Sequence, residues 1–254
     1  MDLQLAGKKV IVGASSQGLG KACALEFARE GADVLICGRT QSTLDSAFSE
    51  IDAAGPGQVV RTKADLSTQA GCEQVLHDAL TAFGKVDILV TNTGGPPPGP
   101  FESHDRAAWD GAYNLLLASA VQLINGVLPK MKEQKWGRII AITSQAVKQP
   151  VNGLILSNSV RASVIGLCRT LANEVGPDNI TVNNVMPGFT RTERLRKLAG
   201  GTDNFDGFAA QVPLGRVGEP SEFSAMVAFL ASERAGYISG CSIPVDGGAT
   251  KGLM

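Results

Sequence analysis

The sequence alternates short apolar runs with longer amphipathic segments along its whole length. The apolar runs are rich in Val and Ile and too short for helices, so they predict buried strands at residues 8–12, 33–37, 59–63, 86–90, 138–143, 180–186 and 242–245. The amphipathic segments predict helices at residues 19–30, 41–54, 67–83, 103–134, 154–175 and 220–231. Strict alternation means parallel strands joined by right-handed helical crossovers. We therefore predict a doubly wound α/β fold, a seven-stranded parallel sheet with helices on both faces.

Composition and charge narrow the class of protein further. A chain of 254 residues with 44% hydrophobic content, no repeat and no linker is expected to form one domain over residues 1–254. Its net charge of -1 gives no electrostatic case for a nucleic acid or an anionic membrane as partner, and no apolar run reaches about 18 residues. Five scattered cysteines without Cys-x-x-Cys spacing argue against disulfides and thiolate metal sites. We expect a cytoplasmic protein without a metal.

Small residues fill the loop between the first predicted strand and the first predicted helix. They let the backbone approach a pyrophosphate, and the helix presents free N–H groups and its positive dipole end. Glycine-rich turns of this kind also occur for packing alone, but the position between strand and helix favours phosphate binding. The candidate cofactor-binding residues here are Gly13, Ser15, Ser16, Gln17, Gly18, Leu19 and Gly20.

The second predicted strand ends in Gly38 and Arg39. Enzymes that prefer NAD place a carboxylate near this point for the ribose 2′-hydroxyl, whereas an Arg accepts the 2′-phosphate of NADP. A guanidinium grips a phosphate through two parallel hydrogen bonds. Arg39 therefore favours NADP(H), the alternative being a solvated surface arginine.

With these features the chain resembles the short-chain dehydrogenase/reductase family over essentially its whole length, which implies a Rossmann-type fold. The family's first loop, Thr-Gly-x-x-x-Gly-x-Gly, is matched with Ala14 in place of the first glycine. The resemblance implies further cofactor contacts at Asp65, Leu66, Asn92, Gly94, Pro187, Gly188, Thr190 and Thr192. It also implies a catalytic role for Ser144 and for Asn114, and often a homotetramer.

The family's catalytic Tyr-x-x-x-Lys pair falls on Ser157 and Arg161. In the family, the Tyr transfers the proton and the Lys lowers the Tyr pKa while binding the nicotinamide ribose. An aliphatic hydroxyl is a poor general acid, and a guanidinium donates hydrogen bonds but keeps its proton. We interpret Arg161, with Ser157, as holding cofactor or substrate; the alternative is a vestigial pair with Arg161 reaching solvent.

The resemblance implies an oxidoreductase acting on a small carbonyl or alcohol, with Ser144 polarising the carbonyl. With Arg39 favouring NADP(H) and with Ser157 in place of the Tyr, we predict an NADP(H)-dependent enzyme in which water delivers the proton. The opposing hypothesis is a nucleotide-binding regulatory or scaffold protein that has lost turnover. Basic residues after the sixth predicted strand would suit an anionic substrate, although a solvated helix face is the alternative; they are Arg191, Arg194, Arg196 and Lys197.

Overall fold

The computed structural model describes residues 2–252 and contains one sheet of seven parallel strands. The strands are β1 (Lys9–Val12), β2 (Asp33–Gly38), β3 (Val59–Lys63), β4 (Ile88–Thr91), β5 (Gly137–Ile142), β6 (Ile180–Pro187) and β7 (Ser242–Val245). Their order in the sheet is β3-β2-β1-β4-β5-β6-β7, with every neighbouring pair parallel. The predicted fold class is confirmed, and the predicted strand ends differ from the observed ones by at most two residues.

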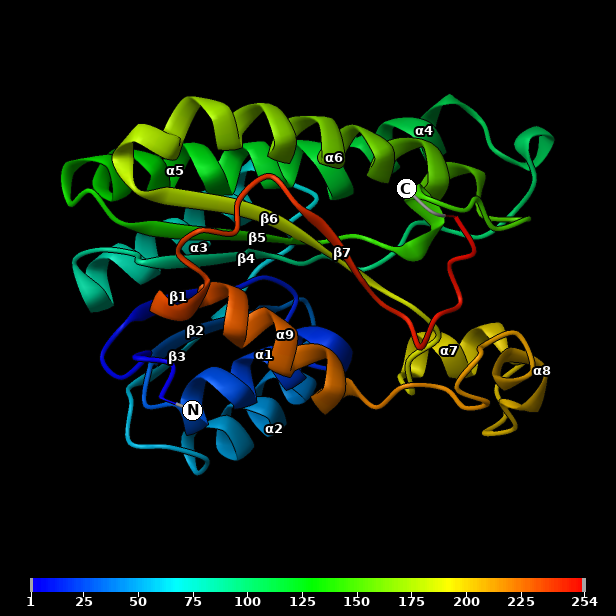
Figure 1. The fold of residues 1–254 in the computed structure, drawn as a ribbon, viewed down its shortest axis with the longest axis horizontal. Coiled ribbons are helices and arrows are strands. Elements are labelled where there is room, and N and C mark those ends of the chain that lie inside the picture. The colour runs from blue at the N-terminus through cyan, green and yellow to red at the C-terminus, as the bar shows by residue number, and fades with distance from the viewer. Residues whose placement is uncertain (1, 253–254) are drawn as a thin grey trace.

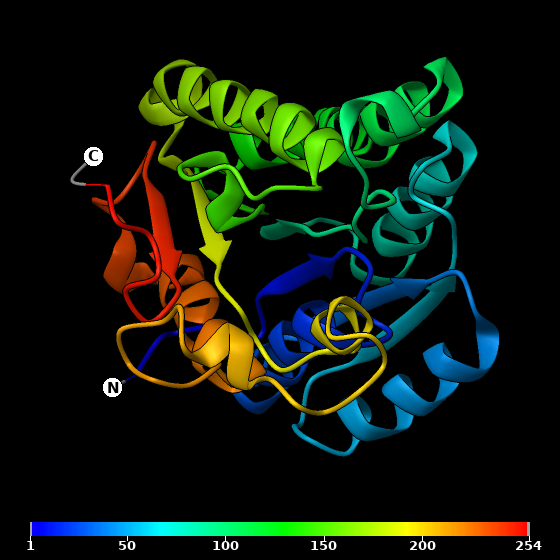
Figure 2. The ribbon, with the colours of Figure 1, turned by 90° about the vertical axis from the view of Figure 1, so that its right-hand side faces the viewer.

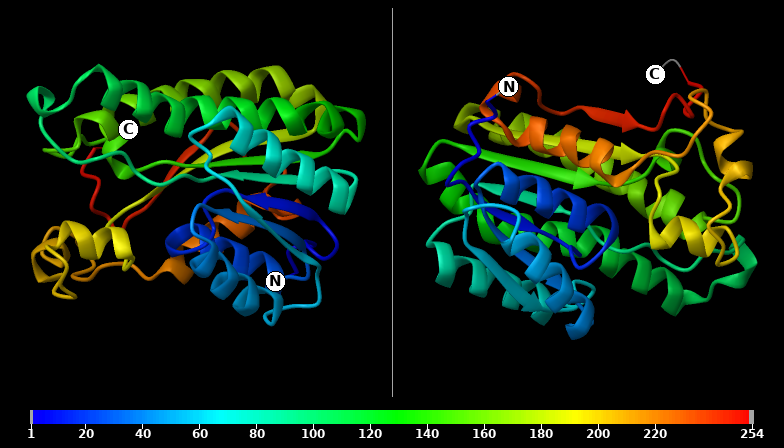
Figure 3. Two further views of the ribbon diagram at one scale, coloured as in Figure 1. Left: turned by 180° about the vertical axis from the view of Figure 1, so that it is seen from behind. Right: turned by 90° about the horizontal axis from the view of Figure 1, so that it is seen from below.

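Helices cover both faces of this sheet (Figure 1; Figure 3). The main helices are α1 (Gly18–Arg29), α2 (Gln41–Asp52), α3 (Gln69–Phe83), α4 (Arg106–Tyr113), α5 (Ser119–Glu133), α6 (Ile155–Val175) and α9 (Pro220–Ala231). Helices α1, α2 and α9 pack on one face, and α3, α4, α5 and α6 pack on the other. Each face buries its own apolar cluster, one around Phe27 and Phe223 and the other around Leu123 and Met131.

The direction of the crossovers reverses between β1 and β4, the two central strands. At such a switch point the loops that follow the strands diverge, and they leave a crevice at the carboxyl edge of the sheet. Figure 2 shows the carboxyl edge of the sheet, with the chain segment that follows β6 lying across it. The fold therefore places the loops after β1, β2, β4, β5 and β6 around one region.

The helix predicted at residues 103–134 is not one regular helix. A short 3-10 turn at Phe101–Ser103 comes first, and the α-helix starts only after Asp105, whose carboxylate accepts a hydrogen bond from the backbone N–H of Ala108. Residues Asn114–Ala118 form a π-helical turn between α4 and α5. Short π-helical turns inside longer helices often occur at functional sites.

By length and composition alone, the helical stretch Arg106–Glu133 could cross a membrane. In this fold α5 packs against α3, β4 and β5 and buries Leu123, Val127 and Met131. Its apolar composition therefore has a sufficient explanation in the core of the domain.

Two short helices, α7 (Glu193–Leu198) and α8 (Asp206–Ala209), were not predicted. The Thr192 side chain caps α7 by accepting a hydrogen bond from the Leu195 backbone N–H at 3.4 Å. Leu195 and Phe205 pack with Val217 in a small separate apolar cluster. This segment lies over the carboxyl edge of the sheet, where it borders the crevice (Figure 2).

Candidate active site

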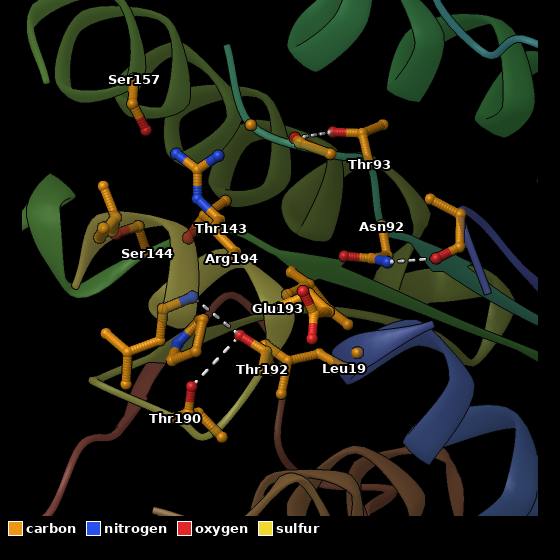
Figure 4. Close-up of a pocket in the computed structure, with 18 of the residues that line it drawn as sticks. Leu19, Asn92, Thr93, Thr143, Ser144, Ser157, Thr190, Thr192, Glu193 and Arg194 are labelled. Atoms are coloured by element: carbon orange, nitrogen blue, oxygen red, sulfur yellow. Dashed lines mark hydrogen bonds between the residues drawn. The ribbon is translucent and has the colours of Figure 1, made fainter. Parts of the chain in front are cut away.

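A cavity of about 610 Å³ lies at the carboxyl edge of the sheet. Its walls come from the loops after β1, β2, β3, β4, β5 and β6 and from α6 and α7. The structure brings most of the predicted site residues to it, namely Ser16, Gln17, Gly18, Leu19, Arg39, Leu66, Asn92, Gly94, Ser144, Ser157, Arg161, Pro187, Gly188, Thr190 and Thr192. Figure 4 shows several of these side chains converging from different loops.

The glycine-rich loop is closed against the end of β4 by Asn92. The Asn92 amide nitrogen donates to the carbonyl oxygens of Gly13 at 3.0 Å and Ala14 at 3.2 Å. A methyl group on Gly13 would overlap the Asn92 backbone, and one on Gly20 would lie 2.5 Å from the Ala14 carbonyl oxygen. These glycines are therefore required for close packing, and Gly18, with φ of 59°, supplies the turn into α1.

Ser15 has a structural position under the same loop. Its side chain is fully buried, donates to the Val12 carbonyl at 2.6 Å and accepts from the Cys37 N–H at 3.0 Å. These bonds tie the loop to β1 and β2. Ser15, like Gly13 and Gly20, shapes the cavity without lining it.

The end of β2 offers a positive charge and leaves little room for an acidic side chain. A side chain at Gly38 would begin 2.8 Å from the Cβ of Ser16, so a carboxylate at this position would displace the loop. Arg39 follows and is exposed to the cavity. The structure therefore presents a guanidinium at the place where the fold positions the ribose of a dinucleotide.

Asp65 lies just outside the cavity lining, although its neighbour Leu66 lies in it. The carboxylate accepts hydrogen bonds from the N–H of Ser67 at 3.0 Å and from its hydroxyl at 2.8 Å. Partial burial favours a higher pKa for Asp65, but the bonds from Ser67 and the charge of Arg39 outweigh it and hold the pKa below its usual value. Asp65 is thus a fixed anion near Arg39.

Ser144 stands at the end of β5 and faces the cavity. Its Oγ accepts a hydrogen bond from the N–H of Ala146 at 3.1 Å, which leaves its hydroxyl hydrogen free to donate. The preceding residue, Thr143, is fixed by a 2.7 Å bond to the Asn184 side chain. Ser144 is therefore a hydrogen-bond donor on a rigid strand end.

Arg161 is buried and held from three sides. It donates from Nε to Ser157 Oγ at 3.2 Å, from Nη1 to the Ile142 carbonyl at 3.1 Å and from Nη2 to the Gly94 carbonyl at 3.1 Å. Burial, and then the charge of Arg194, lower the pKa of Arg161 to about 10, so the side chain stays cationic at neutral pH. The structure therefore excludes the alternative in which Arg161 reaches solvent.

Asn114 is not brought to the cavity. It is exposed at the start of the π-helical turn, and its neighbour Leu115 lines the cavity instead. Among the described residues, no His or Tyr lines the cavity. Within residues 2–252 no three His, Cys, Asp or Glu side chains gather as metal ligands would. The titratable acids among the described lining residues are Glu193, whose carboxylate pairs with Arg196, and Cys37, whose thiol pKa is raised by burial to about 12, so this lining offers no imidazole or phenol for proton transfer.

Of the four basic residues predicted either to suit an anionic substrate or to lie on a solvated helix face, only Arg194 lines the cavity. Its side chain runs from the start of α7 into the cavity and points toward the side where Ser157 lies (Figure 4). The guanidinium lies against Gly95, where a methyl group would overlap it. The lining residues that were not predicted are Ala14, Cys37, Gly38, Ala64, Thr93, Gly95, Pro98, Leu115, Ile142, Thr143, Gln145, Val151, Asn152, Gly153, Leu154, Phe189, Glu193, Leu195, Leu198 and Phe208.

A glycine-rich turn at the switch point of a doubly wound sheet, facing a serine and an arginine in the same cavity, is the arrangement of a dinucleotide-dependent oxidoreductase. Residues 13–250 match the family model described as enoyl-(acyl carrier protein) reductase. The chain is 34% identical to the 3-oxoacyl-(acyl-carrier-protein) reductase FabG of Escherichia coli strain K12, over 95% of this chain and 97% of that one.

Solved structures agree with this match. The L-sorbose reductase of Gluconobacter frateurii, in complex with NADPH and L-sorbose, has a TM-score of 0.93 at 32% identity, with 100% of both chains covered. A 7α-hydroxysteroid dehydrogenase complexed with NADH has a TM-score of 0.91 at 31% identity, covering 100% of this chain and 98% of that one. The chain belongs to the short-chain dehydrogenase/reductase family, and the predicted membership is confirmed.

Proposed function

We propose that this protein is an NADP(H)-dependent oxidoreductase acting on a carbonyl/hydroxyl pair of a small molecule, with an atypical active site. The observation that carries the proposal is the position of Ser144 and Arg161 in the same cavity as the glycine-rich loop. In this active site Ser157 and Arg161 stand where the family pattern has Tyr and Lys. One domain, residues 1–254, would both bind the cofactor and hold the substrate.

The residues present fit a dinucleotide. The small residues of the first loop leave the start of α1 accessible from the cavity, and Gly94 has open space around it. Arg39, without a carboxylate at the end of β2, supports NADP(H) over NAD(H). The L-sorbose reductase was solved with NADPH, whereas the hydroxysteroid dehydrogenase was solved with NADH, so Arg39 is the residue on which the choice rests.

The cofactor, when bound, supplies or accepts the hydride. Ser144 would donate its free hydroxyl hydrogen to the substrate carbonyl oxygen and so polarise it. Arg161 uses three of its five N–H groups on the protein, which leaves two to hold hydroxyls or a developing oxyanion. Neither group releases a proton near neutral pH, so water would protonate the oxygen.

A second candidate function has one specific observation in its favour. Since Arg161 is bound to Ser157 and to two backbone carbonyls, the site holds a cation firmly, but its described lining contains no His, Tyr or Lys to act as a general acid. A regulatory or scaffold protein that binds NADP(H) without turnover would need such a fixed cation but no general acid. NADPH oxidation measured over a panel of carbonyl compounds, beside a direct NADPH titration, distinguishes the two: turnover supports the enzyme, and tight binding without turnover supports the scaffold.

The proposal also covers the location, the oligomeric state and the partners of the protein. We propose a cytoplasmic homo-oligomer, a tetramer by resemblance to the family, that acts on a small molecule and has neither a nucleic acid nor a membrane as partner. The resemblance to the family implied a catalytic role for Asn114, and in this arrangement Asn114 would have to act from outside the cavity lining.

A further inference from the structure

The charges around the cavity are unevenly paired. Arg39 lies at the end predicted for the 2′-phosphate, and Arg161 and Arg194 lie at the end that holds Ser144. Among the described residues, Glu193 supplies the only carboxylate in the lining, and its Oε1 lies 3.4 Å from a nitrogen of Arg196. The catalytic end of the cavity therefore carries two positive charges without a matching anion.

The two guanidiniums contact adjacent residues of the loop after β4. Arg161 donates to the carbonyl oxygen of Gly94, and the guanidinium of Arg194 lies over the adjacent Gly95. The charge of Arg194 is close enough to contribute to the lowered pKa of Arg161, after the larger effect of burial. Two like charges held together favour the binding of an anion between or beside them.

The neighbouring basic residues of the same segment behave differently. Arg191 pairs with Glu219 at 2.8 Å, and Arg196 pairs with Glu193 and, at 3.5 Å, with Asp203. Within residues 2–252, Arg194 has neither an ion pair nor a hydrogen bond through its guanidinium. The basic cluster seen in the sequence thus comprises two ion-paired surface residues, Arg191 and Arg196, the exposed Lys197, and Arg194, which faces the cavity.

The segment that carries Arg194 also contributes apolar side chains to the cavity wall. Leu195, Leu198, Phe189 and Phe208 line this part of the cavity, and the two phenyl rings lie with centroids 5.0 Å apart. A substrate that fits here has a hydrocarbon portion next to its charged group. A planar guanidinium matches a carboxylate through two parallel hydrogen bonds.

We propose that Arg194 is a specificity-determining residue that binds a carboxylate of the substrate, so that the protein acts on oxo acids, or the corresponding hydroxy acids, that carry an apolar chain. This inference rests on the proposed function, because it names the substrate class of the same site. Arg161 contributes to the positive field, and Gly95 is the residue that leaves room for the Arg194 side chain.

The test compares straight-chain oxo acids, with the carbonyl at position two, three or four, with their methyl esters. NADPH oxidation gives kcat/KM, and the thermal shift of the NADPH complex gives binding even without turnover. Three variants are measured beside the parent: Arg194→Met, Gly95→Ala and Lys197→Met. Gly95→Ala displaces the flexible end of Arg194 while the charge stays in the chain. Lys197→Met is the control, because it removes the same charge from the exposed side of α7.

The parent is expected to favour at least one acid over its ester by about tenfold or more, since a hydrogen bond to a charged group has this magnitude. Arg194→Met should remove the preference by lowering kcat/KM for the acid while kcat/KM for the ester stays the same. Gly95→Ala should reduce the preference, and Lys197→Met should keep it. Equal use of acid and ester by the parent would overturn the proposal. So would an Arg194→Met variant that loses NADPH affinity with the acid preference intact, since Arg194 would then bind the cofactor.

The outcome also separates this inference from the proposed function. An acid that stabilises the NADPH complex selectively, without any NADPH oxidation, would support the role of Arg194 and contradict the enzyme. Oxidation of NADPH by neutral ketones, with no preference for acids, would support the enzyme and contradict the role of Arg194.

Discussion

Arg161 Nε donates a hydrogen bond to Ser157 Oγ over 3.2 Å, so two side chains one helical turn apart on α6 form a fixed pair facing the cavity. The pair explains why both residues are buried although both are polar. It also places a permanent cation, instead of a proton donor, in the same cavity as Ser144. The proposed chemistry of the site therefore relies on polarisation of the substrate carbonyl.

Rebuilding a proton donor is the first test of this geometry. The double change Ser157→Tyr with Arg161→Lys introduces a phenol and the ammonium that lowers its pKa. General acid catalysis contributes about 10²–10⁴-fold, and we expect a gain in ketone reduction at the low end, because Arg194 and the surrounding loops stay as they are. NADPH oxidation by the single and double variants measures it. A folded, NADPH-binding double variant without gain on any ketone would count against a latent reductase geometry.

Cofactor choice is expected to depend on Arg39. NADPH should bind more tightly than NADH by at least about tenfold, because a charge-assisted contact contributes about 1.5–3 kcal/mol. Arg39→Ala should lose most of this preference because its affinity for NADPH falls while its affinity for NADH stays the same. Arg29→Ala, an exposed control on α1, should keep the preference. Fluorescence titration with both cofactors gives the affinities. Equal affinities in the parent would refute the role of Arg39.

The close packing of the first loop predicts a cost for any side chain at Gly20. A methyl group there would lie 2.5 Å from the Ala14 carbonyl oxygen and 2.7 Å from the Asn92 amide nitrogen. We expect Gly20→Ala to lower the free energy of unfolding by about 1–3 kcal/mol and to weaken NADPH binding. Gly111→Ala, in α4 with open space around the new methyl group, should be neutral or slightly stabilising. Urea unfolding of both variants and the parent measures the free energies of unfolding. Equal values for Gly20→Ala and the parent would show that the loop accommodates the methyl group.

Asp246 makes the stability of the C-terminal turn depend on pH. Partial burial favours a higher pKa, but hydrogen bonds from Thr250 and from the N–H of Gly248 outweigh it and lower the pKa of Asp246 below its usual value. A carboxyl whose pKa is lowered by folding stabilises the fold fully above its unfolded pKa of about 3.9 and loses this contribution as the pH falls through the folded value.

Asp246→Asn is therefore expected to be less stable than the parent at pH 7, with a difference that is constant down to about pH 5 and narrows below it. Urea unfolding of both proteins at a series of pH values measures this difference. A gap that stays the same into the acid range, or that narrows as the pH rises, would mean that the charge of Asp246 is not what holds the turn.

The alternation of apolar and amphipathic segments was sufficient to predict the sheet, because buried parallel strands and their crossover helices have distinct periodicities. The 3-10 turn at Phe101–Ser103 and the π-helical turn at Asn114–Ala118 were missed. Both depend on local hydrogen bonding inside a pattern that otherwise indicates one helix.

Some residues of the cavity could likewise be placed from the sequence, and others could not. Residues at strand ends, such as Ser144 and Asn92, could be placed from the sequence, since parallel strands end at one edge of the sheet. Arg194 could not, because its position depends on how the segment after β6 folds back over that edge. The glycine at position 95 indicates the position of Arg194 only when the structure shows that the Arg194 guanidinium lies against Gly95. Ser15 was assigned to the cofactor by the loop pattern, yet its hydroxyl bonds to Val12 and Cys37.

The most direct measurement of the proposed activity is NADPH oxidation by Ser144→Ala beside the parent, at saturating NADPH, on the best carbonyl substrate of the panel. If Ser144 polarises the carbonyl, turnover should fall by roughly 10²-fold or more while the NADPH dissociation constant stays nearly the same. Turnover that is unchanged in Ser144→Ala would contradict hydride transfer at this site as described.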